Sequence, residues 1–110
     1  MSGTLHGTPR IRIPAQARPG ETIEVRVLMD HPMETGLPHG DGTALPRDMI
    51  ARLEVRRDGA LLFAADLGNG TATNPYHVFH VRMERSAEFT FTWTDERGRS
   101  ARAVARVAVG

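Results

Sequence analysis

The chain has 110 residues, a formal net charge of +1 and no cysteine. That length is enough for one domain with its own core, and the missing thiols exclude disulfides, a cysteine nucleophile and a zinc–thiolate site. Acidic and basic side chains interleave and no long apolar run occurs, so neither nucleic acid nor a membrane is an expected partner.

Residues 1–9 are polar and glycine-rich, and they are expected to form a disordered arm that does not have the pattern of a signal peptide. Taken alone, the missing leader would place the chain in the cytoplasm. Alternating apolar and polar residues then predict strands over 10–14 and 22–30, and Arg18-Pro19-Gly20-Glu21 between them has the composition of a turn.

The second half of the chain repeats this alternation. A strand is predicted over 50–57, and the two-residue hairpin signal Asp58-Gly59 leads into the next strand. Further strands are predicted over 76–83, 88–94 and 100–109. The inward-facing residues of these strands are predicted to be Ala51, Leu53, Val55, Leu61, Phe63, Ala65, Phe79, Val81, Met83, Phe89, Phe91 and Trp93.

No stretch keeps a helical period over three turns. About seven short strands separated by turn signals predict an all-β fold, an antiparallel immunoglobulin-like β-sandwich, as a single domain over residues 10–110. Trp93 and Tyr76 are expected to be core and corner residues of that sandwich.

Some predicted strands also carry apolar residues on the face that should meet solvent. Leu28, Leu62 and Val78 are the examples that matter most, and Val104 is another. Gathered on one sheet, they would form a patch that a partner protein covers. We therefore expect a partner-binding surface that includes Leu28, Leu62 and Val78.

The segment from His31 to Asp48 separates two strands and is about 18 residues long, which is more than a compact domain usually carries without a functional reason. Pro32 removes a backbone donor and ends the preceding strand. Met29, His31 and Met33 alternate there, and thioether with imidazole is a ligand set suited to copper(I), to which His39 and His6 would add further donors. Against this, Met29 continues the inward face of its strand, where methionine usually fills the core.

Catalysis has little support in the sequence. Its serines, Ser2, Ser86 and Ser100, lie in arm or turn positions outside any nucleophile pattern. The carboxylates near the loop are typical of solvated caps rather than of an acid–base pair. No catalytic residue, cofactor or metal is therefore predicted, and a partner-binding module is the favoured class.

Several separated motifs resemble one family over residues 10–109. In chain order they are Arg10-Ile11-Arg12-Ile13-Pro14, Gly20-Glu21, Val27-Leu28-Met29-Asp30-His31-Pro32-Met33-Glu34-Thr35-Gly36, Leu45-Pro46-Arg47-Asp48-Met49-Ile50, Asn74-Pro75-Tyr76-His77-Val78-Phe79 and Phe89-Thr90-Phe91-Thr92-Trp93-Thr94-Asp95. With these the chain resembles the SoxZ family, the Z subunits of the SoxYZ sulfur carrier of bacterial thiosulfate oxidation.

The resemblance implies an immunoglobulin-like fold and a heterodimer with SoxY, whose C-terminal cysteine arm holds the sulfur intermediates. It also implies a non-catalytic role and a periplasmic location without a signal peptide of its own, by co-export with SoxY. A homodimer in the absence of SoxY is the alternative assembly, and a periplasmic copper(I)-binding sandwich is the alternative function. The loop 31–48 is then expected to offer docking contacts to other Sox enzymes through Met33, Glu34 and Arg47, or else only to close one end of the sandwich.

Overall fold

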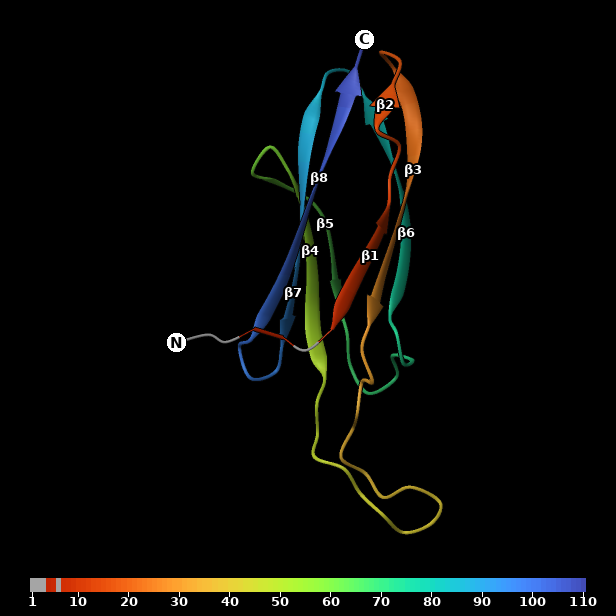
Figure 1. Cartoon of the computed structure of the whole chain (residues 1–110), viewed down its shortest axis with the longest axis vertical. Coiled ribbons are helices and arrows are strands. Elements are labelled where there is room, and N and C mark those ends of the chain that lie inside the picture. Colours follow the sequence, from red (N-terminus) through yellow and green to blue (C-terminus); the bar gives the residue numbers. More distant parts are fainter. Residues whose placement is uncertain (1–3, 6) are drawn as a thin grey trace.

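The computed structural model describes residues 4, 5 and 7–110 and contains two β-sheets packed face to face (Figure 1). Among these residues no helix is of the length and apolarity that a bilayer crossing needs. The strands are β1 (Thr8–Arg12), β2 (Gln16–Ala17), β3 (Glu21–Asp30), β4 (Ile50–Arg57), β5 (Ala60–Asp66), β6 (Tyr76–Met83), β7 (Ala87–Asp95) and β8 (Ser100–Val109). The prediction of an all-β, immunoglobulin-like sandwich is confirmed.

The first sheet has the strand order β1-β3-β6 and the second has the order β2-β8-β7-β4-β5. All neighbouring strands are antiparallel except β2, which pairs in parallel with β8. The first two strands thus cross from one sheet to the other and close one side of the sandwich. On the opposite side, between β5 and β6, the rings of Phe63 and Phe79 stack with their centroids 4.8 Å apart.

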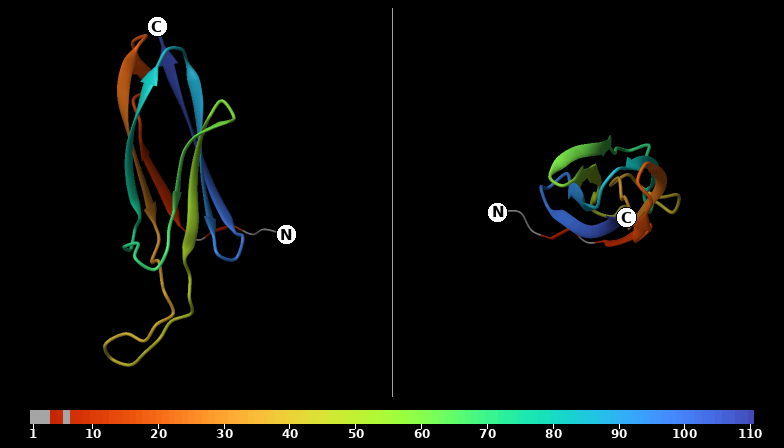
Figure 2. Two further views of the ribbon diagram at one scale, coloured as in Figure 1. Left: turned by 180° about the vertical axis from the view of Figure 1, so that it is seen from behind. Right: turned by 90° about the horizontal axis from the view of Figure 1, so that it is seen from above.

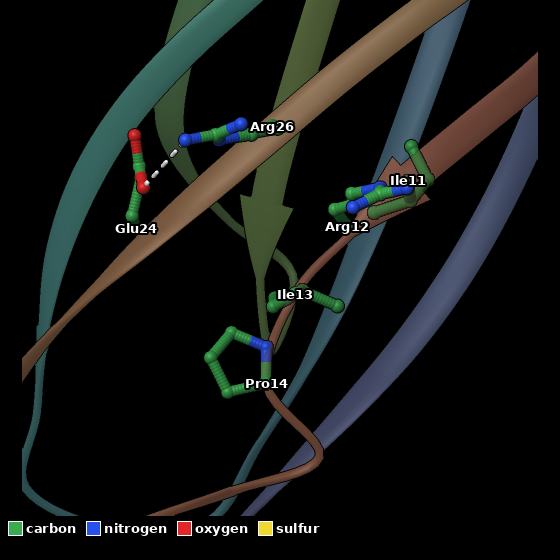
Figure 3. A pocket seen from close by; sticks show the side chains of 6 residues that line it. All are labelled: Ile11, Arg12, Ile13, Pro14, Glu24 and Arg26. Atoms are coloured by element: carbon green, nitrogen blue, oxygen red, sulfur yellow. Dashed lines mark hydrogen bonds and ion pairs between the residues drawn. The ribbon is translucent and has the colours of Figure 1, made fainter.

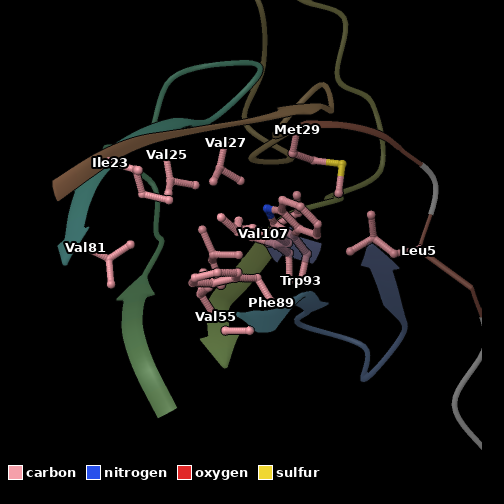
Figure 4. Close-up of a cluster of buried hydrophobic side chains, with 14 of the residues drawn as sticks. Leu5, Ile23, Val25, Val27, Met29, Val55, Val81, Phe89, Trp93 and Val107 are labelled. Carbon is pink, nitrogen blue, oxygen red and sulfur yellow. The ribbon is translucent and has the colours of Figure 1, made fainter. Parts of the chain in front are cut away.

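The core forms where the inward faces of the two sheets meet (Figure 4). Strict alternation on β3 and β7 produces this face, because every second side chain of a strand points the same way. Trp93 is fully buried at its centre, as predicted. The other fully buried large side chains include Phe89, Phe91, Met29, Leu53, Val25 and Val27.

Irregular pairing of β4 alters the predicted inward set. The register shifts between Ile50 and Arg52, so Ile50 is fully buried while Ala51 is only half-buried. A second shift between Val55 and Arg56 pairs Arg56 with Leu61, which exposes Leu61 and lets Leu62 pack against the core. The inward assignment of Leu61 and the outward assignment of Leu62 were therefore wrong, since a bulge reverses the alternation beyond it.

The N-terminal residues are more ordered than the sequence predicts. Thr8 and Pro9 already belong to β1, and Leu5 is buried with its N–H donating to the carbonyl of Ser100 at 3.0 Å. A Cβ on Gly7 would come within 2.7 Å of the Met29 sulfur, so only glycine fits this approach to the core. The predicted disordered arm is thus wrong for these residues, and residues 1–3 and 6 lie outside the described part of the chain.

Candidate functional site

The long segment after β3 leaves the end of the sandwich as a narrow projection (Figures 1 and 2). The outgoing and returning sides of this projection are joined near its base by a backbone bridge between Glu34 and Asp48. The two N–H···O hydrogen bonds of this bridge measure 2.8 and 2.7 Å. The segment is therefore closed at its base by one isolated bridge, and the residues beyond the bridge form the projection.

His31 fastens the base of this projection from inside. It is buried, its Nδ1 accepts a hydrogen bond from the N–H of Met33 at 2.9 Å, and its Nε2 lies 3.4 Å from Oδ1 of Asp48. The backbone N–H of His31 donates to Oδ1 of Asn74, and the N–H of Asn74 returns a bond to the carbonyl of His31, both at 2.9 Å. The imidazole therefore holds the backbone at Met33 on one side of the projection and lies beside the Asp48 carboxylate of the other side.

A chain of charges continues from there into the β7–β8 turn. Arg99 donates to Asp48 at 3.0 Å and to Asp95 at 2.6 Å. Asp95 is buried and also accepts the backbone N–H groups of Arg97 and Arg99. Burial alone would raise the pKa of Asp95, but the hydrogen bonds from Arg99 and Arg97 outweigh it and lower that pKa.

Arg47 clamps the outside of the same base. Its guanidinium donates to both carboxylate oxygens of Glu96, at 2.7 and 2.9 Å, to the carbonyl of Thr35 at 2.9 Å and to Oδ1 of Asn69 at 2.7 Å. The side-chain hydrogen bond from Arg47 lowers the pKa of Glu96. Arg97 in turn donates to the carbonyl of Arg47 at 2.8 Å.

These contacts occupy the residues that the sequence suggested for docking. Met33 is buried, and its sulfur accepts the N–H of Ile50 at 3.4 Å. Glu34 accepts the N–H of Gly36 at 3.3 Å, and Arg47 already makes four hydrogen bonds. Met33, Glu34 and Arg47 hold the base of the projection in this structure.

The copper(I) ligand set is not assembled either. Met29 lies in the core, and the Met33 sulfur and the His31 Nδ1 each accept a backbone N–H. His39 sits 3.4 Å from Glu34, and His6 lies outside the described residues. Among residues 4, 5 and 7–110, no three His, Asp or Glu side chains gather in the geometry of a metal site.

The outward-facing apolar residues separate into two groups. Leu28 and Val78 both lie on the outer face of the three-stranded sheet, where Arg26 pairs with Val78 and Leu28 pairs with Tyr76. Leu62 belongs to β5 of the other sheet and packs against the core. The predicted patch therefore keeps Leu28 and Val78 and loses Leu62, because the β4–β5 bulge turns that side chain inward.

Tyr76 takes the third place in the patch. Its side chain is 53% exposed, beside Val78 at 41%, so Tyr76 does not lie in the core. The alternation of β6 predicts this orientation, because successive side chains of a strand point to opposite faces. Tyr76 therefore shares a face with exposed Val78 and lies on the face opposite buried Val81. We call Leu28, Tyr76 and Val78 the sheet-face patch.

Three arginines border the sheet-face patch. Arg10, Arg12 and Arg26 line, with Leu28 and Tyr76, a groove of about 270 Å³. Arg10 pairs with Asp30 at 3.5 Å and Arg26 with Glu24 at 3.4 Å, whereas Arg12 has no carboxylate within 4.0 Å in the described part of the chain. A second open depression of about 640 Å³ adjoins it, between Arg26 and Pro14 (Figure 3).

The outer face of the five-stranded sheet is different. Three half-buried threonines alternate along β7. Arg52 of β4 pairs with Asp66 of β5, and Arg56 pairs with Glu54 along β4. Val104 and Leu61 are exposed there, but they lie on β8 and β5, with β7 and β4 between them. Such isolated apolar residues are ordinary on a solvated surface.

Solved structures with the same fold include proteins of more than one kind. The sulfur carrier protein SoxY from Chlorobium limicola f thiosulfatophilum has a TM-score of 0.68 and 16% identity, over 93% of this chain and 78% of that chain. A superoxide reductase (neelaredoxin) from Ignicoccus hospitalis has a TM-score of 0.73 and 19% identity, over 94% and 80%. At these identities the similarity shows the fold alone.

The sequence itself is more specific than the fold. No curated protein sequence matches the chain. The family model described as Sulphur oxidation protein SoxZ matches residues 11–106, which includes β2 to β7 in full and all but three residues of both β1 and β8. The chain therefore belongs to the SoxZ family of sulphur oxidation proteins.

Proposed function

We propose that this protein is the non-catalytic subunit of a SoxYZ-type sulfur carrier in bacterial thiosulfate oxidation. In this role it binds a SoxY-type subunit, whose cysteine arm holds the sulfur intermediates, and presents that subunit to other Sox enzymes. The observation that carries the proposal is the match to the SoxZ family over residues 11–106 of a chain without cysteine. A chain without a thiol needs a partner to hold sulfur covalently through cysteine.

The sheet-face patch is the proposed contact surface for the SoxY-type subunit. Leu28, Tyr76 and Val78 place apolar groups on the outer sheet face, near the end at which β3 finishes and β6 begins, and the arginines beside them provide a polar rim. An apolar centre with a polar rim that includes arginine and tyrosine is the usual composition of a protein–protein interface. The five-stranded sheet offers scattered apolar residues among charged pairs instead.

The absence of catalysis is proposed from the chemistry of the described residues. The hydroxyl of Ser86 accepts the N–H of Val109 at 2.9 Å, and Ser100 begins β8. The Nδ1 atom of buried His31 accepts a hydrogen bond from the backbone N–H of Met33. Neither serine is paired with a base in the described part of the chain, and such a pair is what hydroxyl nucleophiles need.

The expected location is the periplasm, reached by co-export with the SoxY-type subunit. This follows from the role of the complex in thiosulfate oxidation as the family implies it. Expression of this chain with and without its partner, followed by fractionation, tests the proposal. Periplasmic recovery that depends on the partner's leader supports co-export, and recovery that is independent of the partner contradicts it.

The binding proposal is tested with two matched charge substitutions. Val78→Arg places a cation in the sheet-face patch, and Val104→Arg places the same cation at an exposed position of the other sheet. Calorimetric titration with the SoxY-type protein of the same genome should give a 1:1 complex with wild type and with Val104→Arg. With Val78→Arg the Kd should rise about a hundredfold or more, as for a central interface position. An unchanged Kd for Val78→Arg removes this face from the interface.

A further inference from the structure

The projection beyond the Glu34–Asp48 bridge carries the most exposed large apolar side chains of the described residues. Leu37 is 64% exposed and Leu45 is 58% exposed. They flank the turn that spans His39 to Thr43. We call residues 35–47 the loop arm. Two large aliphatic groups on one projecting element are not needed by the core, which they do not touch.

Hydrogen bonds hold the loop arm at both its base and its tip. Its base is fixed by the contacts of Arg47 with Thr35 and Glu96. Its tip is held by the bond from the N–H of His39 to the carbonyl of Thr43 at 2.6 Å and by the Asp41 carboxylate, which accepts from the N–H and hydroxyl of Thr43. Prolines at 38 and 46 restrict the backbone further. Because little conformational freedom remains, little is lost when the arm is immobilised in an interface.

The direction of the loop arm links it to the sheet-face patch. In Figure 1 the arm leaves the lower end of the sandwich and bends to the side on which β3 and β6 lie. The view from above in Figure 2 places it on the same side. A partner seated on the outer face of β1, β3 and β6 would therefore meet the arm as well.

The size of the sheet face calls for such a second contact. Its strands have 5, 10 and 8 residues, and side chains alternate between the two faces, so about 12 residues face outward. A stable heterodimer takes about 20–30 residues from each partner. The outer face of the three-stranded sheet thus supplies about half of the contact residues that are needed, and the loop arm is the neighbouring element that can supply more.

We propose that the loop arm is the second half of the interface, with Leu37 and Leu45 packing into an apolar surface of the same SoxY-type subunit that covers the sheet-face patch. This rests on the function proposed above. The sequence predicts docking contacts at Met33, Glu34 and Arg47, which are buried or hydrogen-bonded at the base of the projection. The contacts proposed here are made instead by Leu37 and Leu45, near its tip.

The test is the double variant Leu37→Ser with Leu45→Ser, titrated calorimetrically against the SoxY-type protein. Its matched control is Leu61→Ser with Val104→Ser, which removes two side chains of similar exposure from the other sheet. The arm variant should bind with a Kd raised about tenfold or more, because buried aliphatic side chains are lost from the interface. The control should bind like wild type, and both variants should keep the melting temperature of the isolated chain.

Two results overturn this proposal while leaving the proposed function standing. One is a wild-type Kd for the arm variant when Val78→Arg still disrupts binding. The other is a wild-type Kd together with slower thiosulfate-dependent turnover in the reconstituted system, which would assign the leucines to a Sox enzyme instead. If wild-type protein fails to bind the SoxY-type subunit at all, it is the proposed function that fails.

Discussion

Asp95 is predicted to be the most costly single carboxylate to remove from this protein. It is 4% exposed and accepts three hydrogen bonds, from the backbone N–H groups of Arg97 and Arg99 at 2.9 and 2.8 Å and from Nε of Arg99 at 2.6 Å. Asp95→Ala leaves these donors without an acceptor at a site with little access to water. Each unsatisfied donor costs about 1–3 kcal/mol, and we expect a total loss of about 3 kcal/mol.

Urea denaturation followed by circular dichroism measures this loss. At about 4 °C per kcal/mol for a domain of this size, the melting temperature should fall by about 12 °C. The matched control is Asp66→Ala, which breaks a 2.7 Å ion pair with Arg52 whose carboxylate side chain is 81% exposed. Exposed pairs contribute about 0–1 kcal/mol, so this variant should remain close to wild type. Equal effects of the two substitutions would refute the view that Asp95 organises the β7–β8 turn.

Four further outcomes are expected. The free energy of unfolding of the wild type should decrease below pH of about 4, because folding lowers the pKa of Asp95 and this stabilisation is lost as the pH falls through the folded-state pKa. In Asp95→Ala the free energy of unfolding should depend less steeply on pH in this range. An equally steep dependence in the two proteins would contradict this. Trp93→Ala should lower the free energy of unfolding by about 3–5 kcal/mol in urea titration, and a loss below 1 kcal/mol would mean that the core is packed differently. Gly36→Ala should lower the melting temperature, since φ is +83° and the new Cβ would lie 3.1 Å from Cβ of Arg47, whereas Gly40→Ala, with no atom within 4 Å, should melt like wild type. Copper(I) titration should give no tight equivalent, because the thioether and imidazole donors at the base of the projection already accept backbone hydrogen bonds, and a tight 1:1 site would overturn that assignment.

Strand positions were readable from the sequence wherever alternation was regular. β3 and β7 agree with their predictions within one residue at each end, because one face of each strand is fully buried and that burial fixes the pattern. The hairpin at Asp58-Gly59 is also confirmed, with both residues at positive φ as the two-residue turn requires. Local pattern and tertiary packing agree in all three elements.

The errors arose where pairing, rather than the strand's own sequence, decides orientation. The extra residue is Ala51 of β4 in one bulge and Leu62 of β5 in the other, and neither bulge is marked by a glycine. The two-residue strand β2 exists only through its pairing with β8 and has no local signal. Leu5 is buried because the second sheet offers its N–H a partner at Ser100, which a local pattern cannot show.

The sheet-face patch could be predicted only in part, because contacts between distant segments decide which residues stay exposed. Leu28 and Val78 follow from alternation, and their meeting on one sheet follows from the β3–β6 register. The bonding of Arg47 to Glu96 joins residues 49 positions apart, so no local pattern could exclude Arg47 from docking. The docking role of the loop stays a prediction, and only the structure separates its fixed base from its exposed leucines.

Mass spectrometry of the co-expressed pair tests whether this chain binds a SoxY-type subunit that alone carries the sulfur. This chain and the SoxY-type protein of the same genome are purified together, exposed to thiosulfate with the other Sox proteins, and weighed first as a native complex and then as separate denatured subunits. We expect a 1:1 complex in which every sulfur adduct is carried by the SoxY-type subunit and this chain keeps its unmodified mass. Subunits that separate during purification, or a sulfur adduct on this chain, would contradict it.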